Sequence, residues 1–396
     1  MRENEDQPSP EHQLAESFNP RVLVINSARK WIGEAAHCIS LVRGLQNRGI
    51  HVILVCRKGY ALEAFAKKQG IPHDTLRMKG NFTGVHDLLD LLKLRRIIKR
   101  HQINVIHCHR GKDHWLSASV RFLLAPWKRK PVVIRTRHVV VPVKTHFFNR
   151  WLYKHGTNAV IAVSRAAAAS YEDLVLRSIP IIIYAPVDSE RFNPGKRSEE
   201  RRRRLGIPSD DTTAPLIGLV GRFQRIKGQQ LLIRAAEIIL KSIPNARFVL
   251  AGKGSEERKQ ALLRLAVKHK VESYFHFTGY QEDIEFLIAS LDVGVAPSLG
   301  SEGSSRIVME YMASGVPIVA SAVGGIPEIL EDGKYGRLVE PGDPNELADA
   351  VTEVLKHPEK SKKSASAALE KARQFHHIDR FLDETLNVYR NSLEKV

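Results

Sequence analysis

Short apolar runs alternate with amphipathic helical patterns along nearly the whole chain, and this alternation restricts the fold more than any other feature. The first run, Arg21 to Asn26 (RVLVIN), is almost continuously apolar, as is typical of parallel strands covered on both faces. Further runs in the first half are HVILVC, INVIHC, PVVIRT, NAVIAV and IPIIIY. A second series comprises PLIGLVG, RFVLAG, YFHFTG, LDVGVAP and VPIVAS. The pattern predicts the α/β class, with two doubly wound, Rossmann-like domains.

The length of 396 residues fits two or three domains at about 150 residues each. We place a polar tail at 1–19, a first domain at 20–187, a second domain at 188–375 and a closing helical region at 376–396. The charge-dense stretch from Asp188 to Ala214 interrupts the alternation and is expected to form a linker and a surface helix. Open α/β sheets bind ligands at the carboxyl ends of their strands, so two facing domains predict a site in a shared cleft.

Several features favour a cytoplasmic protein. No apolar run reaches the ~18 residues that a membrane-spanning helix needs. The polar N-terminal segment has no apolar signal-peptide core, and the odd number of cysteines suits reduced thiols.

Most of the formal net charge of +18 is concentrated in one stretch. Between Leu91 and Tyr171 seventeen Lys and Arg residues face a single acid, Asp113. Such a patch suits an anionic membrane surface, an anionic substrate, nucleic acid or no partner at all. No nucleic-acid recognition element accompanies it, and the basic residues from Lys93 to Arg100 lie on a Leu/Ile-rich helix. We therefore expect a peripheral protein at the inner face of the cell membrane and no nucleic-acid partner.

The segment from Pro297 to Pro317 contains a strand-to-helix junction suited to phosphate. A helix is predicted to begin near Arg306, with Ser304 or Ser305 as its N-cap. Free backbone N–H groups and the positive dipole end make such a helix start a phosphate-binding site.

Two acids flank this junction, Glu302 and Glu310. If the residues between them were all helical, their carboxylates would lie ~12 Å apart, which is about the span from ribose to sugar in a nucleotide sugar. The alternative is that Glu302 caps the helix and Glu310 forms a surface ion pair.

A second segment, Gly218 to Gly228, leads from a strand into a helix. Gly221 ends the strand, and Arg222 and Lys227 stand five positions apart across a tight loop. Two cations there could neutralise a diphosphate and stabilise it as a leaving group. Alternatively, Lys227 only solvates a helix start.

Together with Leu250 to Arg258 (LAGKGSEER) and His276 to Tyr280 (HFTGY), these segments resemble retaining glycosyltransferases of family 4, which have the GT-B fold. The motifs match in order from about Pro215 to Glu340. The resemblance implies a bacterial lipopolysaccharide or cell-surface glycan type. It also implies that the second domain binds the nucleotide sugar, that the first binds the acceptor, and that the last helix, Asp379 to Glu394, returns to the first domain.

The resemblance also assigns roles to individual residues. It implies that Arg222 and Lys227 bind the diphosphate. Glu310 would bind the ribose and Glu302 the donor sugar. The other implied donor contacts are made by Gly33, Gly221, Gly252, Tyr280 (beside the base), Ser304, Ser305 and Arg306.

In the first domain, His138 falls where the family places a histidine that faces the donor sugar, and we expect a catalytic role for it beside Glu302, Arg222 and Lys227. His107 and His109 could be metal ligands or core histidines, and we favour the core. Three further basic residues are predicted to meet acceptor phosphates: Lys112, Arg135 and Arg137.

The resemblance implies transfer of a hexose with retained configuration, from a UDP-hexose first and a GDP-sugar next. The acceptor would be a lipid-linked or lipopolysaccharide-type glycan. No Asp-x-Asp motif is present, so we expect no metal and no further cofactor. A sugar-nucleotide epimerase of the same fold and a non-catalytic nucleotide-sugar-binding module are the alternatives.

Overall fold

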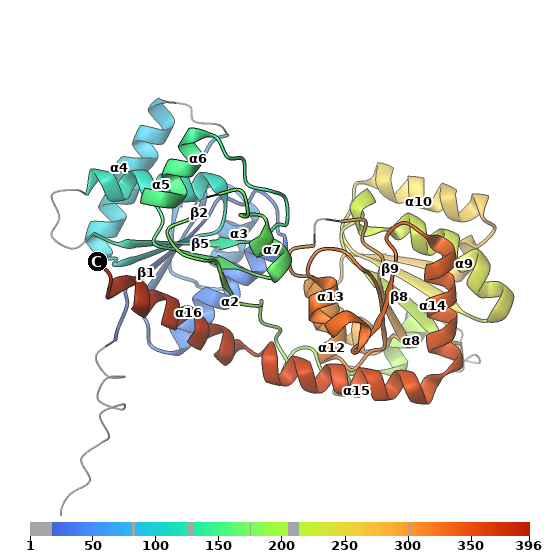
Figure 1. Cartoon of the computed structure of the whole chain (residues 1–396). Coiled ribbons are helices and arrows are strands. Elements are labelled where there is room, and N and C mark those ends of the chain that lie inside the picture. The colour runs from blue at the N-terminus through green and yellow to red at the C-terminus, as the bar shows by residue number, and fades with distance from the viewer. Residues whose placement is uncertain (1–17, 81–83, 125–129, 175, 205–213, 301) are drawn as a thin grey trace, which may run out of the picture.

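The computed structural model describes residues 18–80, 84–124, 130–174, 176–204, 214–300 and 302–396. Figure 1 shows two α/β domains side by side, each built on a parallel sheet. This architecture is the one that the alternation of apolar runs and helices predicts.

The first sheet has seven parallel strands in the order β3-β2-β1-β4-β5-β6-β7. Its strands are β1 (Val22–Asn26), β2 (Val52–Arg57), β3 (His73–Leu76), β4 (Val105–Cys108), β5 (Val132–Arg137), β6 (Ala159–Ala162) and β7 (Ile181–Ile182). Its helices are α2 (Gly33–Asn47), α3 (Ala61–Lys68), α4 (Val85–His101), α5 (Gly111–Leu123), α6 (Phe147–His155) and α7 (Arg165–Ala169). Val22 and Val24 face one core and Leu23 and Ile25 the opposite one, so both faces are buried.

The second sheet has six parallel strands in the order β10-β9-β8-β11-β12-β13. Its strands are β8 (Leu216–Val220), β9 (Arg247–Ala251), β10 (Phe275–Gly279), β11 (Val293–Ala296), β12 (Ile318–Ser321) and β13 (Arg337–Val339). Its α-helices are α8 (Glu199–Arg204), α9 (Gln229–Ser242), α10 (Glu256–Lys268), α11 (Ile284–Ala289), α12 (Arg306–Ala313), α13 (Ile326–Ile329) and α14 (Pro344–Lys356). Short 3-10 turns cover Pro194–Lys196, Arg225–Lys227, Glu272–Tyr274 and Glu331–Gly333.

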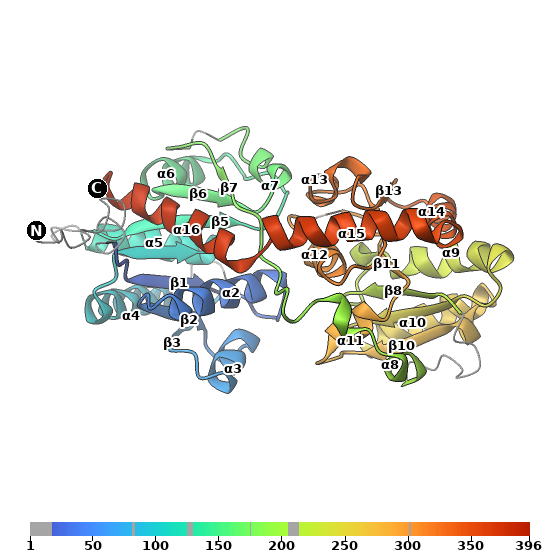
Figure 2. The same ribbon diagram turned by 90° about the horizontal axis from the view of Figure 1, so that it is seen from below.

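Two consecutive helices, α15 (Pro358–Phe375) and α16 (Ile378–Leu393), lie beneath both domains in Figure 1 and run across both of them in Figure 2, which is seen from below. Alanines of α15 pack in the core of the second domain, whereas α16 packs its apolar face on α2 and β5. At Gly44 of α2 a Cβ atom would lie 2.6 Å from Leu382, so a side chain there would push the returning helix away. The last helix therefore ties the C-terminus to the first domain.

The strands β3 and β13 are absent from the predicted set of strands. They read HDTL and RLV, are three or four residues long and lie at sheet edges, so they lack the continuous apolar run of a central strand.

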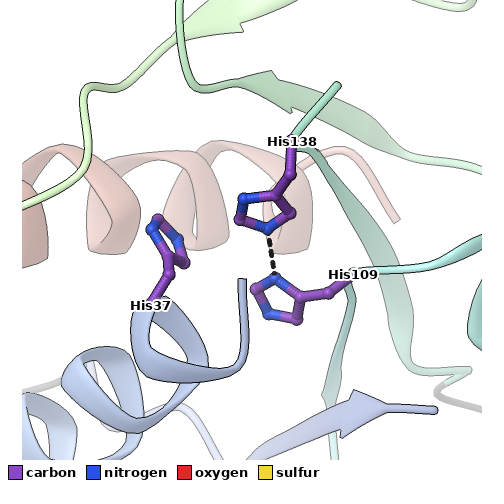
Figure 3. A group of neighbouring side chains, drawn as sticks. All are labelled: His37, His109 and His138. Atoms are coloured by element: carbon purple, nitrogen blue, oxygen red, sulfur yellow. Dashed lines mark hydrogen bonds between the residues drawn. The ribbon is translucent and has the colours of Figure 1, made fainter. Parts of the chain in front are cut away.

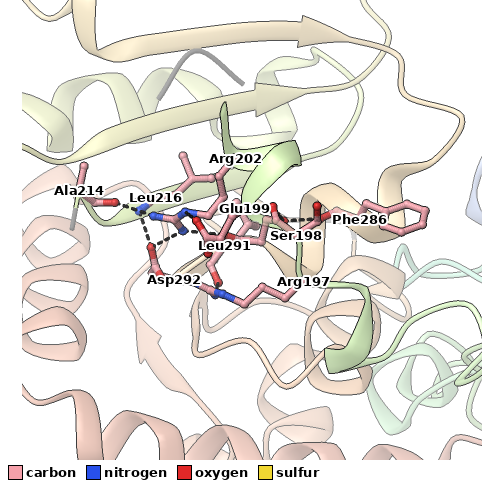
Figure 4. Close-up of polar contacts among 10 residues, drawn as sticks. Arg197, Ser198, Glu199, Arg202, Ala214, Leu216, Phe286, Leu291 and Asp292 are labelled. Atoms are coloured by element: carbon pink, nitrogen blue, oxygen red, sulfur yellow. Dashed lines mark hydrogen bonds and ion pairs between the residues drawn. The ribbon is translucent and has the colours of Figure 1, made fainter. Parts of the chain in front are cut away.

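The charge-dense linker also differs from expectation, because its helix α8 directs one arginine inward. Arg202 is only 4% exposed, and its guanidinium donates to the carbonyls of Ser290 (2.9 Å) and Ala214 (2.8 Å). It also pairs with Asp292 at 2.9 Å, as Figure 4 shows. Asp292 in turn accepts from the backbone N–H of Leu216 at 2.8 Å. This network anchors the linker to the first strand of the second domain.

All three cysteines, Cys38, Cys56 and Cys108, are buried and form no disulfide. None of the helices in the described ranges is both long and apolar enough to cross a membrane.

We predict that Arg202→Met lowers the free energy of unfolding by about 3 kcal/mol, because it leaves Asp292 and two buried carbonyls short of partners. Urea denaturation followed by circular dichroism measures the loss. The exposed neighbour Arg203 is the control, and Arg203→Met should have little effect. Equal stability of the two variants would show that the Arg202 network does not hold the linker.

Candidate functional site

The site lies in the seam where the carboxyl ends of the two sheets face each other. Three close contacts join the domains there. A Cβ atom on Gly303 would lie 2.1 Å from the carbonyl oxygen of His138, and one on Gly325 would lie 2.9 Å from Ser164. The backbone N–H of Arg165 donates to the Glu328 carboxylate at 2.8 Å. Strand order reverses between β1 and β4 and between β8 and β11, so the seam contains both topological switch points.

An ion pair between Lys227 and Glu302 forms the centre of the site in the second domain. Glu302 also accepts from the Ser298 hydroxyl at 2.7 Å, and its side chain is only 8% exposed. Gly228, with φ of 74°, lets the loop after β8 approach the end of β11, since a Cβ atom there would lie 1.9 Å from the Pro297 carbonyl oxygen. This contact brings Lys227 to Glu302 from a segment 75 residues away.

Glycines allow the loops around this pair to approach one another closely. Gly221 follows β8, and a Cβ atom on it would lie 3.9 Å from the aliphatic stem of Lys227. At Gly252, with φ of 148°, a Cβ atom would lie 2.0 Å from the Gly221 carbonyl oxygen, so the ends of β8 and β9 require this glycine. Arg222 lines an open cavity at the seam.

The start of α12 is open to a ligand. Ser305 occupies the N-cap position and Ser304 precedes it, but no side chain caps the helix. The Ser305 hydroxyl is buried and has no hydrogen-bond partner among the described residues. The first N–H groups of α12 therefore keep their capacity to bind an anion.

Arg306 and Glu310, one turn apart on α12, pair with each other at 3.2 Å. Burial raises the pKa of Glu310, and the charge of Arg306 opposes that rise. The stem of Arg306 lies 3.4 Å from the position of a Cβ atom on Gly33, so the start of α2 meets the start of α12 across the seam. The carboxylates of Glu302 and Glu310 are thus held by different cations.

Tyr280 lies further out, just after β10. It is 56% exposed, and the Lys253 ammonium lies 4.3 Å from its ring centroid. This ring offers a flat apolar surface at the edge of the site.

Three imidazoles from the first domain meet at the seam in Figure 3: His37, His109 and His138. Nδ1 of His109 lies 3.0 Å from Nε2 of His138, so one of these two nitrogens donates a hydrogen bond to the other. Burial and the neighbouring positive groups, including Arg135, hold the pKa of His138 well below its usual value. At neutral pH His138 is therefore an uncharged hydrogen-bonding group.

The candidate metal ligands in the described part of the chain are these same three histidines, whose ligand atoms lie within 4.8 Å of one another. The charges around them disfavour a divalent cation. Burial and then Arg306 lower the pKa of His37 to about 3. The hydrogen bond between His109 and His138 also uses a lone pair that a metal would need. His37 lies inside α2 and not at the end of a strand, so no sequence motif pointed to it. His107 is a core residue, bonded to the hydroxyls of Tyr389 (2.6 Å) and Thr136 (2.5 Å).

The three residues that were predicted to contact acceptor phosphates have different surroundings in the structure. Arg135 is 4% exposed and donates to the carbonyls of Thr136 (2.8 Å) and Cys108 (3.4 Å), so it stabilises the core and we no longer assign it to the acceptor. Arg137 donates to the Ser170 hydroxyl at 3.3 Å and to a loop carbonyl. Lys112 pairs with Asp87 at 2.5 Å and lines the cavity at the seam.

That cavity has a volume of about 540 Å³. Three of its basic residues, Arg29, Lys30 and Arg57, were not singled out in the sequence. The sequence did contain a signal for these residues, because each lies at or just after the end of an apolar strand. Arg57 is the last residue of β2, and Arg29 and Lys30 stand three and four positions after the end of β1.

Comparison with known families assigns both halves of the chain. Residues 32–191 match the model described as "Glycosyltransferase Family 4", and residues 214–357 match "Glycosyl transferases group 1". A D-inositol 3-phosphate glycosyltransferase of Corynebacterium urealyticum is 29% identical over 277 residues, which cover 64% of this chain and 63% of that protein. The chain thus spans less than two thirds of the length of this relative. An uncharacterized glycosyltransferase of Methanocaldococcus jannaschii is 27% identical over 390 residues, 91% of this chain and 95% of that protein.

Solved structures share the fold over nearly the whole chain. A glycosyltransferase from Rickettsia africae has a TM-score of 0.83 at 19% identity and covers 96% of this chain and 100% of its own. HepE from Anabaena, solved with UDP-glucose, has a TM-score of 0.79 at 21% identity, with coverage of 95% and 100%. From the motifs at the seam, the two family models and this shared two-domain architecture, the chain belongs to the family 4 glycosyltransferases and has the GT-B fold.

Proposed function

We propose that the seam transfers a hexose from a nucleotide sugar, with retained configuration and without a metal, to a lipid-linked or lipopolysaccharide-type glycan. UDP-hexose is the favoured donor and a GDP-sugar the next. The observation that carries the proposal is the placement of Lys227, Glu302 and the uncapped start of α12 around one point of the seam. HepE, a protein of the same fold, was solved with UDP-glucose, and this supports a UDP-sugar.

Positive charge would hold the donor diphosphate and stabilise it as a leaving group. An ammonium has three N–H donors, so Lys227 can keep its bond to Glu302 and still donate to phosphate. Arg222 and the N–H groups of α12 add charge and donors that are fixed before the reaction. These groups would supply the field that a divalent ion provides in other glycosyltransferases.

The donor sugar would then lie between Glu302 and His138. Glu302 is fixed by Lys227 and Ser298, which suits it to accept hydrogen bonds from sugar hydroxyls. The same two partners withdraw electron density from the carboxylate and make it a poor covalent nucleophile. We therefore favour departure of the diphosphate and attack of the acceptor on one face of the sugar. The departing diphosphate oxygen takes the acceptor proton.

The membrane part of the proposal is supported by one face of α4. Four apolar side chains at helical spacing are 47–72% exposed: Val85, Leu88, Leu89 and Leu92. Arg96 and Lys99 continue the same face towards the C-terminus of the helix and are exposed. The two acids of α4 turn inward, since Asp90 accepts from the backbone N–H groups of Arg77 and Met78 and Asp87 pairs with Lys112. This arrangement is typical of a helix that lies in the surface of an anionic membrane, here the inner face of the cell membrane.

We expect the protein to release nucleoside diphosphate from UDP-hexoses only when a glycan acceptor is present. NMR of the product should show the anomeric configuration of the donor, and EDTA should not reduce the rate. A new UDP-sugar formed without acceptor would identify an epimerase instead. Binding without any product would identify a non-catalytic module.

Lys227→Met should lower kcat by at least about 100-fold, the usual effect of removing one donor aimed at developing negative charge. Steady-state kinetics with saturating donor measures the loss. Arg225→Met, two positions earlier and exposed, is the matched control and should stay close to wild type. A normal kcat for Lys227→Met would contradict the site.

Flotation with liposomes tests the membrane claim. The wild type should bind vesicles containing anionic phosphatidylglycerol and bind neutral phosphatidylcholine much less. The double change Leu88→Gln, Leu92→Gln should weaken binding, whereas Val267→Gln, at an equally exposed apolar position on α10, should not. Equal binding to both kinds of vesicle at moderate salt would rule out electrostatic docking.

A further inference from the structure

A cavity on the first-domain side of the seam has a lining that is dominated by basic residues. It is lined by the loop after β1, the end of β2, the segment after β3, the start of α5 and Arg222 of the second domain. We propose that this cavity binds a phosphate group of the acceptor and that Arg57 is its main ligand. The proposal rests on the proposed function and extends it by naming the acceptor class and the residue that selects it.

The charge of the lining is strongly positive. Six of the eleven lining residues are basic, and none is acidic: Arg29, Lys30, Arg57, Arg110, Lys112 and Arg222. Two of the six are balanced by acids behind them, Arg110 by Glu34 at 3.3 Å and Lys112 by Asp87 at 2.5 Å. The other four have no ion pair with a described residue. A dianionic phosphate would therefore enter a site with an excess of positive charge.

The surroundings of Arg57 point to an anionic ligand. It is the last residue of β2 and is only 8% exposed. Its guanidinium lies over the Tyr60 ring, 4.7 Å from the centroid, and its buried Nε has no hydrogen-bond partner among the described residues. A buried guanidinium with an unused N–H is unfavourable unless an anion completes it. Its planar N–H groups match two oxygens of a phosphate.

The N-termini of two helices, α2 and α5, add to the positive potential of the cavity. Ile32 and Gly111 line the cavity at the starts of α2 and α5, which have 15 and 13 residues. No side chain caps α2, so its first N–H groups are open, and the dipoles of both helices place positive ends at this cavity. The cavity also lies where β1 and β4 diverge, which is the switch point of the first sheet.

The cavity is distinct from the donor diphosphate site. Lys227 and the first turn of α12 are not part of its lining, and Arg222 alone is shared. A donor held by Lys227 and α12 would leave Arg57, Arg29 and Lys30 available for a second anion. The transferred sugar would then lie between the acceptor phosphate, held by the first domain, and the donor diphosphate, held by the second.

Isothermal titration with inorganic phosphate, on protein saturated with UDP, tests this assignment. UDP occupies the donor site, so phosphate can report only the second site. We expect wild type to bind phosphate under these conditions and Arg57→Met to lose at least about tenfold in affinity. The exposed neighbour Lys58 does not line the cavity, and Lys58→Met should bind within about twofold of wild type. Lys30→Met, at an exposed position where the fold is not at risk, should lose a few-fold.

The outcomes separate the two claims. Failure of wild type to bind UDP would count against the proposed function. Normal UDP binding, with no phosphate binding to the saturated protein or with equal binding by Arg57→Met, would overturn the assignment of the cavity alone.

Transfer assays then distinguish the sources of the phosphate. A soluble hexose phosphate and a polyprenyl diphosphate-linked sugar in detergent are compared with the corresponding free hexose. Arg57→Met should raise the acceptor KM for whichever phosphorylated acceptor is used and leave that for the free hexose unchanged. An equal change of KM for phosphorylated and free acceptors would contradict phosphate recognition.

Discussion

The ion pair between Lys227 and Glu302 is the contact on which the geometry of the site depends. It joins the loop after β8 to the loop after β11, which are the two loops that border the switch point of the second sheet. Gly228 makes this approach possible, because any side chain there would collide with Pro297. Glu302 also accepts from the backbone of Gly325 through its carbonyl, at 2.8 Å. A single, partly buried pair thus fixes the cation and the acid relative to each other.

The sequence predicted the central strands and the two-domain class well, because buried parallel strands leave long apolar runs. It missed β3 and β13, since an edge strand is held by backbone pairing on one side and needs no such run. It also described α8 as a surface helix. Composition could not reveal that Arg202 turns inward, because its partners, Ser290 and Asp292, come from a segment about 90 residues later.

The candidate site was predictable to a similar degree. Motif spacing placed Lys227, Glu302 and Arg306 at strand-to-helix junctions, where the structure has them. Their pairing was not predictable, since Lys227 binds Glu302 while Arg306 binds Glu310. Arg135 illustrates the limit for charged residues in strands: whether such a side chain faces the cleft or the core depends on nearby carbonyls that only the folded sheet brings together.

Electrostatics links three parts of the first domain: the exposed face of α4, the basic cavity and the cluster of histidines. Three acids of the first domain have partners within the domain. Asp87 pairs with Lys112 and Glu34 pairs with Arg110, whereas Asp90 accepts from backbone N–H groups. Four cations of the cavity (Arg29, Lys30, Arg57 and Arg222) and the exposed Arg96 and Lys99 of α4 have no ion pair with a described residue, so their charge acts on the surroundings of the domain. The histidines between them stay neutral, because burial and the surrounding cations lower their pKa values. A neutral His138 can donate to or accept from a sugar hydroxyl without repelling the cations that would hold the phosphates on either side. Burial first, and then the same positive field that would draw an anionic membrane and a phosphorylated acceptor towards this domain, thus keep the imidazoles in the neutral form that sugar recognition needs.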